Sequence, residues 1–135
     1  MIPKFRAWDK RKSVMREVAV LHFTKGGKVN GIEYWKTPSE LKSYHVRNLA
    51  LMQSTGLKDK NGVEIFEGDV VVVENHPFQR KEDSSAGMEI EGDYVVGWNQ
   101  HDLTWCAGDL LLARLKPYVR VIGNIYDNPD LLEAE

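Results

Sequence analysis

Short apolar, β-branched segments separated by turn signals are the feature that most restricts the fold of this chain. The clearest are residues 14–23 (VMREVAVLHF), the valine run 70–73 and the stretch 118–126. Val and Ile fit the pleated surface of a sheet, and Gly and Asn allow the positive φ angles of tight turns. Runs this short, each followed by a turn signal, are typical of strands. The pattern therefore predicts a mainly β protein.

Other segments complete a set of strands. In residues 4–9 (KFRAWD), the side chains of Lys4, Arg6 and Trp8 fall on one face of an expected strand. Gly26-Gly27 fits a two-residue type I′ turn, because both positions then need positive φ. Further strands are expected at 28–35, 49–53, 93–98 and 103–107, and residues 55–62 are expected to form a polar loop.

Two short helices are expected. The run Thr37-Pro38-Ser39-Glu40 combines a cap, a proline for the first helical position and a capping-box glutamate, which predicts a helix through about Val46. Asp109 can cap a second helix over 110–115, and Pro117 would end it. Residues 75–91 have no periodicity and are expected to form a long loop.

The length of 135 residues suits a single domain, 1–135, with one stable core. In the second half, the order of strands and one short helix suits a small, bent SH3-like barrel. A barrel closes its edges, which suits a short chain with many strands. We therefore expect an SH3-like barrel preceded by an N-terminal β-hairpin region, with one or two short helices in all.

Charge is distributed unevenly along the chain. Residues 1–60 hold 13 Lys and Arg against 5 Asp and Glu, whereas residues 61–135 hold 5 against 15. The expected domain therefore has a basic part, 1–60, and an acidic, barrel-forming part, 61–135. A basic surface of this kind can bind nucleic acid. The alternative is that the two halves face each other, within one chain or between subunits.

Several functional classes have no support in the sequence. With one cysteine, Cys106, no intramolecular disulfide can form, as expected in a reducing compartment. We find neither a signal peptide nor an apolar run of about 20 residues, so we expect a cytoplasmic protein that does not enter a membrane. Gly26-Gly27 lacks the spacing of a phosphate-binding or dinucleotide-binding loop.

Catalytic and metal-binding candidates are few. Cys106 and His101 are the one plausible nucleophile and base, but a hairpin over 98–106 would hold them apart. None of the four histidines pairs with another histidine or with the cysteine at a metal-ligand spacing. Before a strand lies an acidic cluster of Glu64, Glu67 and Asp69, and Asp93 could lie near it. Such a cluster could bind Mg²⁺ or be a solvated turn. We expect no enzyme activity and no cofactor.

Basic residues near the N-terminus are the best candidate for a contact surface. Basic groups contact phosphates, and an exposed aromatic can stack on a base, so this segment is a candidate for binding nucleic acid or a protein partner. The alternative is an edge strand protected by its charges, with Trp8 packed elsewhere. The candidate residues are Lys4, Arg6, Trp8, Lys10, Arg11 and Lys12.

Three segments carry a family resemblance: KFRAWD at 4–9, LMQSTGLKDKNG at 51–62 continuing through IFEGD at 65–69, and VIGNIYDNPDLL at 121–132. Together they resemble the YopX family of small proteins encoded by bacteriophages and prophages. The resemblance spans nearly the whole chain. It implies an SH3-like core and a protein that works in the cytoplasm of a bacterial host. It implies no particular mechanism, because the family has no assigned activity.

Three functions remain open from the sequence. The first is a non-catalytic binding or assembly module that contacts a host protein, a phage protein or a second copy of itself. The second is a nucleic-acid-binding protein that uses the basic N-terminal half. The third is an enzyme that uses Cys106 with His101 or the acidic cluster.

Overall fold

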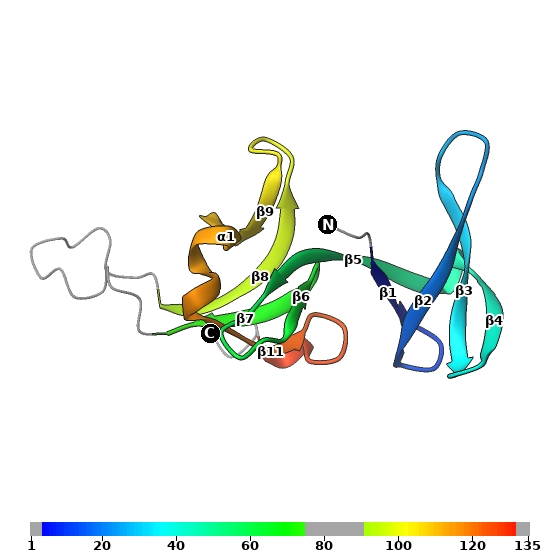
Figure 1. Cartoon of the computed structure of the whole chain (residues 1–135), viewed down its shortest axis with the longest axis horizontal. Coiled ribbons are helices and arrows are strands. Elements are labelled where there is room, and N and C mark those ends of the chain that lie inside the picture. Colours follow the sequence, from blue (N-terminus) through cyan, green and yellow to red (C-terminus); the bar gives the residue numbers. More distant parts are fainter. Residues whose placement is uncertain (1–3, 75–90, 132–135) are drawn as a thin grey trace, which may run out of the picture. The chain divides into compact units, whose positions relative to one another are not determined.

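The computed structural model describes residues 4–74 and 91–131, so most of the predicted loop 75–91 lies outside the described residues. These residues are mainly β, as predicted (Figure 1). The strands are β1 (Phe5–Asp9), β2 (Val14–Phe23), β3 (Val29–Thr37), β4 (Glu40–His45), β5 (Leu49–Lys58), β6 (Glu64–Phe66), β7 (Asp69–Val73), β8 (Gly92–Asn99), β9 (Thr104–Ala107), β10 (Leu110–Leu111) and β11 (Val119–Asn124).

Short helical segments interrupt the strands. The α-helix α1 (Leu112–Leu115) is followed by the 3₁₀ helix η3 (Lys116–Tyr118), and further 3₁₀ turns are η1 (Val46–Asn48) and η4 (Pro129–Leu131). No helix among residues 4–74 and 91–131 is long and apolar enough to cross a membrane.

The chain divides into two compact units, residues 1–54 (unit 1) and 55–135 (unit 2). The strands form two sheets. The strand order is β4-β3-β2-β1-β5-β6 in one sheet and β10-β9-β8-β7-β11 in the other. Each order runs from one edge strand to another, so neither sheet closes on itself. The predicted SH3-like barrel is therefore not confirmed. Closure depends on strand tilt and stagger, which the pattern of apolar residues does not specify.

Unit 1 buries side chains on both faces of its sheet. Ala7 belongs to a cluster with Ile32, Tyr34 and Leu49. The next residue, Trp8, points to the opposite face and packs with Ala50 and Met52. Because successive strand residues point to opposite faces, β1 is covered by apolar neighbours on each side. This arrangement makes β1 the centre of the unit.

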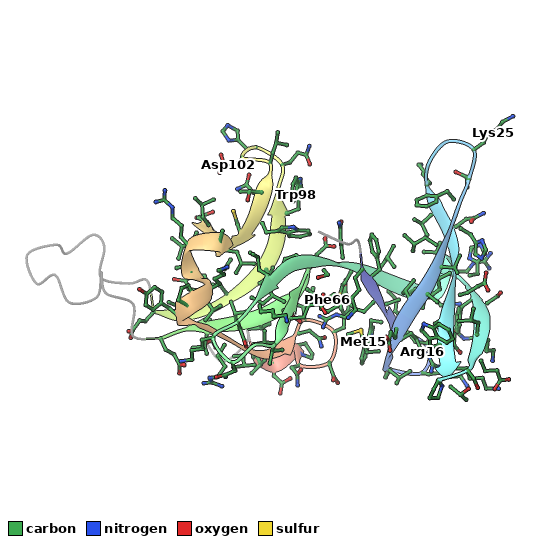
Figure 2. The ribbon with its side chains drawn as sticks, in the orientation of Figure 1. Met15, Arg16, Lys25, Phe66, Trp98 and Asp102 are labelled. Carbon is green, nitrogen blue, oxygen red and sulfur yellow. The ribbon has the colours of Figure 1, made fainter. Side chains whose placement is uncertain are left out.

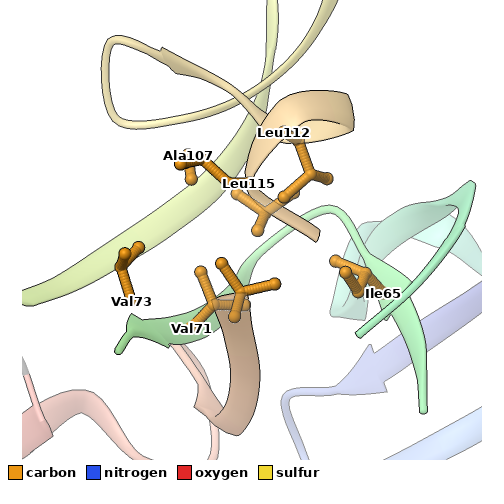
Figure 3. Packing of buried hydrophobic residues seen from close by; sticks show 8 residues of the cluster. Ile65, Val71, Val73, Ala107, Leu112 and Leu115 are labelled. Atoms are coloured by element: carbon orange, nitrogen blue, oxygen red, sulfur yellow. The ribbon is translucent and has the colours of Figure 1, made fainter. Parts of the chain in front are cut away.

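Unit 2 has one larger core beneath α1. Leu112 and Leu115 point from α1 onto buried side chains of the sheet, as Figure 3 shows. The other buried residues of this core are Ile65, Val71, Val73, Val96, Ala107 and Val119. Within the predicted helix 110–115, only Leu112–Leu115 is helical. The residue before α1 is Leu111, which makes no side-chain capping bond, so the predicted cap at Asp109 is wrong.

The predicted helix from Thr37 to Val46 is also wrong, since β4 occupies most of it. The Thr37 hydroxyl accepts the N–H of Ser39 at 3.4 Å within the turn that joins β3 to β4. β4 pairs with β3, and the rings of Tyr34 and Tyr44 lie 6.2 Å apart across the two strands. Such cross-strand packing outweighs a local capping signal.

Two turns also differ from the prediction. The β2–β3 connection has five residues, 24–28. A hydrogen bond closes it, in which the N–H of Thr24 donates to the carbonyl oxygen of Lys28 at 2.7 Å. Only Gly27 has a positive φ, 90°, so this is not a two-residue Gly-Gly turn. The predicted loop 55–62 is strand as far as Lys58, since β5 continues beside β6.

Candidate functional site

The turn between β1 and β2 presents consecutive basic residues above a buried carboxylate. Asp9 is fully buried, and its Oδ1 accepts the backbone N–H groups of Arg11 and Lys12, each at 3.1 Å. The backbone N–H of Ser13 closes the turn on the carbonyl oxygen of Asp9 at 2.7 Å. The side chains of Lys10, Arg11 and Lys12 are therefore carried by a hydrogen-bonded turn and are exposed.

The second oxygen of Asp9 binds Arg16. Its Oδ2 lies 3.2 Å from Nη2 of Arg16, and the guanidinium stacks 4.5 Å from the centre of the Tyr34 ring. Burial acts to raise the pKa of Asp9, but hydrogen bonds from Lys12, Arg16 and Arg11 outweigh burial and hold that pKa below its ordinary value. Asp9 is therefore a structural anion of unit 1.

A second basic segment joins this turn. The N–H of Lys10 donates to the carbonyl oxygen of Asn48 at 2.9 Å, which brings η1 beside the turn. Arg47 lies in η1 and is exposed, and its backbone N–H donates to Nδ1 of His45 at 3.0 Å. We call the exposed cations Lys10, Arg11, Lys12 and Arg47 the basic end of unit 1.

The other predicted contact residues do not share this surface. Trp8 is only 8% exposed and packs inside unit 1, so it is unavailable for stacking on a base. The packed tryptophan agrees with the alternative given above, but β1 pairs with both β2 and β5, so the expected edge strand is wrong. Lys4 lies at the opposite end of β1, where its carbonyl oxygen accepts the N–H of Ser54. Arg6 lies between them and is half-buried. Five strand residues separate Lys4 from the turn, about 17 Å of extended chain.

Sequence reasoning missed Arg47. It lies 37 positions after Lys10, in a segment whose capping signal suggested the end of a helix. Only the pairing of β4 with β3, and of β5 with β1, returns this segment to the β1–β2 turn. No local signal in the sequence identifies that contact.

The end of the β8–β9 hairpin is a second exposed feature. Trp98 pairs directly with Trp105 across the strands, and the rings meet edge to face at 5.3 Å and 77°. Trp98 is 46% exposed and Leu103, at the tip, is 65% exposed. Figure 2 shows Trp98 and Asp102 toward this end of the hairpin. We call Trp98, Leu103 and Trp105 the aromatic end of unit 2.

The turn at the aromatic end has a defined conformation. The N–H of Asp102 donates to Oδ1 of Asn99 at 2.9 Å, and Leu103 has φ 53°. A positive φ is uncommon for a leucine, because its Cβ then crowds the backbone. Sequence reasoning predicted a polar tip here and missed Leu103, although an apolar residue beside a turn was the available signal.

The remaining sequence candidates are dispersed or buried. Cys106 is buried in β9, whereas the side chain of His101 is 95% exposed at the hairpin tip. Asp69 is buried, and its Oδ2 accepts the N–H of Phe66 at 2.8 Å. Its carboxylate therefore stabilises the turn between β6 and β7. Asp93 lies opposite Val72, three residues further along β7. The part of the chain that the structure describes contains no group of three side chains placed to hold a metal.

Two comparisons found similarity to known proteins over nearly the whole chain. The family model described as YopX protein matches residues 4–133. The crystal structure of protein EF1440 from Enterococcus faecalis is similar, with a TM-score of 0.68 and 29% sequence identity. That match covers 98% of this chain and 99% of the other. No curated protein shows significant sequence similarity to this chain.

Proposed function

We propose that this chain, which belongs to the YopX family, is a non-catalytic binding module that contacts a protein partner through the aromatic end of unit 2. The partner is a host or phage protein, and the chain works in the cytoplasm of a bacterium that carries the phage. Neither the family's description nor the name of the similar protein from Enterococcus faecalis states an activity, so the proposal rests on exposed side chains.

The exposed leucine at the hairpin tip is the observation that carries the proposal. A leucine with φ 53° costs about 1 kcal/mol relative to a residue suited to that conformation. At 65% exposure it recovers little of that cost by burial. Asn or Gly would suit this turn better, so folding alone does not favour leucine here. A role in binding accounts for the side chain.

The neighbouring tryptophans support the same role. Trp is among the residues that contribute most to binding energy at interfaces, and an edge-to-face partner such as Trp105 limits its motion before binding. Polar groups at Asn99, His101 and Asp102 surround the tip. An apolar centre with a polar rim is the usual arrangement of a protein interface.

A catalytic role finds less support from the geometry. A cysteine nucleophile needs a base within hydrogen-bond reach. Cys106 lies opposite Gly97 in the paired region of the hairpin, beyond Trp105 and Thr104 from the turn that carries His101. We therefore propose that the chain has no cysteine-dependent activity.

Affinity capture from phage-infected lysate, after nuclease treatment, tests the proposal. The captured protein is purified, and its affinity is measured by calorimetry for the wild type, Trp98→Ala, Leu103→Asn and a control, Val63→Asn. Val63 is 49% exposed in another turn of unit 2. We expect Trp98→Ala to weaken binding by ~30-fold, Leu103→Asn by ~10-fold and the control by less than about twofold.

Thermal unfolding of Leu103→Asn separates binding from folding. Because Asn tolerates positive φ, we expect this variant to unfold at the wild-type temperature or up to about 4 °C above it. Capture of no specific protein would refute the proposal, as would equal affinities for wild type and both hairpin variants. If the captured protein is another copy of this chain, sedimentation of the variants replaces calorimetry and the same two criteria apply.

A further inference from the structure

Unit 1 is a basic unit in its own right. Residues 1–54 hold 11 Lys and Arg against 4 Asp and Glu, a balance of +7, although the whole chain carries −2. A strongly basic domain is the electrostatic footprint of nucleic-acid binding. Because these residues form a compact unit, their charge is the relevant quantity, rather than the net charge of the chain.

Half of the acidic residues in unit 1 contact a basic side chain of the same unit. Asp9 is buried against Arg16, and Oε2 of Glu33 lies 2.9 Å from Nε2 of a histidine. The other two acidic residues, Glu17 and Glu40, are exposed on strands. Pairing therefore cancels little of the positive charge at the basic end.

The basic end concentrates this charge on a turn that is ordered before binding. Two N–H bonds to Asp9 and the bond from Lys10 to Asn48 fix the backbone of Lys10–Lys12, and the bond from the N–H of Arg47 to His45 holds the fourth cation's backbone. A fixed backbone lowers the entropy lost on binding. We propose that Lys10, Arg11, Lys12 and Arg47 bind the phosphate backbone of double-stranded nucleic acid, independently of the aromatic end.

Burial of Trp8 determines the kind of binding. Single-strand binders combine a basic groove with aromatic side chains on which bases stack. The aromatic residue of this segment is packed inside unit 1. Contacts from the basic end therefore go to phosphates, which fix position and carry no base sequence. Binding depends little on sequence and weakens steeply with salt.

The magnitude follows from the number of cations. Each phosphate neutralised on a duplex contributes about −0.9 to the slope of log affinity against log salt, so four contacts give roughly −3.6. The measurement is the fluorescence anisotropy of a labelled duplex of about two helical turns, titrated with the full chain between about 50 and 200 mM salt. Two duplexes of unrelated sequence are compared with a single strand of the same length.

Two double variants, each of which removes two positive charges, test where on unit 1 the nucleic acid binds. Lys10→Ala/Lys12→Ala removes two ammonium groups from the basic end, and Lys25→Ala/Lys28→Ala removes two from the turn between β2 and β3. Figure 2 shows Lys25 at that turn, at the other end of β2 from Arg16. We expect the slope to become less negative by about 1.8 in the first variant, from roughly −3.6 to roughly −1.8, and to stay within about 0.3 of wild type in the second.

A substitution of Arg47 tests whether the residue that the fold brings beside the β1–β2 turn takes part in binding. Arg47→Gln keeps the backbone bonds of η1 and removes one charge, so we expect the slope to become less negative by about 0.9. Equal losses in the two double variants would overturn the proposal, because only net charge would then matter. Tighter binding of the single strand, or an Arg47→Gln slope equal to wild type, would also overturn it.

Discussion

Replacement of the buried carboxylate under the β1–β2 turn is the most informative perturbation of unit 1. In Asp9→Asn the remaining amide oxygen can keep the N–H groups of Arg11 and Lys12. The new NH₂ group then faces the guanidinium of Arg16, which lies 3.2 Å from Oδ2 in the wild type, so a donor meets a donor. The substitution removes a charge-assisted bond from a fully buried position.

The expected cost is about 2 kcal/mol, the usual contribution of a hydrogen bond to a charged group. For a chain of this size that corresponds to a fall in unfolding temperature of about 8 °C. Urea unfolding followed by circular dichroism gives the free energy directly. Glu17→Gln is the matched control, because Glu17 is exposed on the neighbouring strand β2 and its loss should cost less than about 0.5 kcal/mol.

The pH dependence tests the physical cause. The folded pKa of Asp9 lies below its unfolded value of about 3.9, so its contribution is complete above that value and is lost as pH falls through the folded pKa. The difference between wild type and Asp9→Asn should therefore be full at pH 7 and shrink below about pH 4. The reasoning is refuted if Asp9→Asn costs no more than Glu17→Gln, or if the difference persists unchanged in acid.

Three further predictions concern unit 2. Asp59 accepts three backbone N–H groups, and its pKa is lowered. Asp59→Ala should therefore reduce the free energy of unfolding by about 3 kcal/mol, measured in urea at neutral pH. A reduction below about 1 kcal/mol would contradict this. A Cβ on Gly123 would lie 2.5 Å from Oδ1 of Asn128, so Gly123→Ala should lower thermal stability by about 1 to 3 kcal/mol, and an unchanged unfolding temperature would show that the contact relaxes. Cys106 is 3% exposed, so a thiol reagent should label it far more slowly in the native protein than in urea, and equal rates would contradict its burial.

The sequence predicts strands well where the local pattern and tertiary packing agree. β2 coincides with the predicted range 14–23, and β7 contains the valine run 70–73. The segment from Thr37 to Val46 shows the opposite case. Its helix signal is local, whereas the pairing of Tyr44 with Ile32 in the register of β3 and β4 depends on a neighbouring strand. Prediction failed there because the stronger interactions are not local.

The candidate sites show the same division. Consecutive residues such as Lys10–Lys12 can be recognised in the sequence, because one turn carries them together. Arg47 reaches the same surface only through the bond between Lys10 and Asn48, and Trp8 leaves it because its face of β1 is covered. Which face of a strand is open to solvent depends on what packs against it, and alternation alone does not specify that.

The course of β5 limits how this protein can be divided. The boundary between the units falls between Ser54 and Thr55, inside the strand Leu49–Lys58, so the chain passes from one unit to the other without a linker. A fragment that ends at residue 54 would leave the last four residues of β5 on the other fragment. Neither fragment can then be exchanged between relatives as an independent unit. Recombination should be tolerated better in the surface turns than at this boundary.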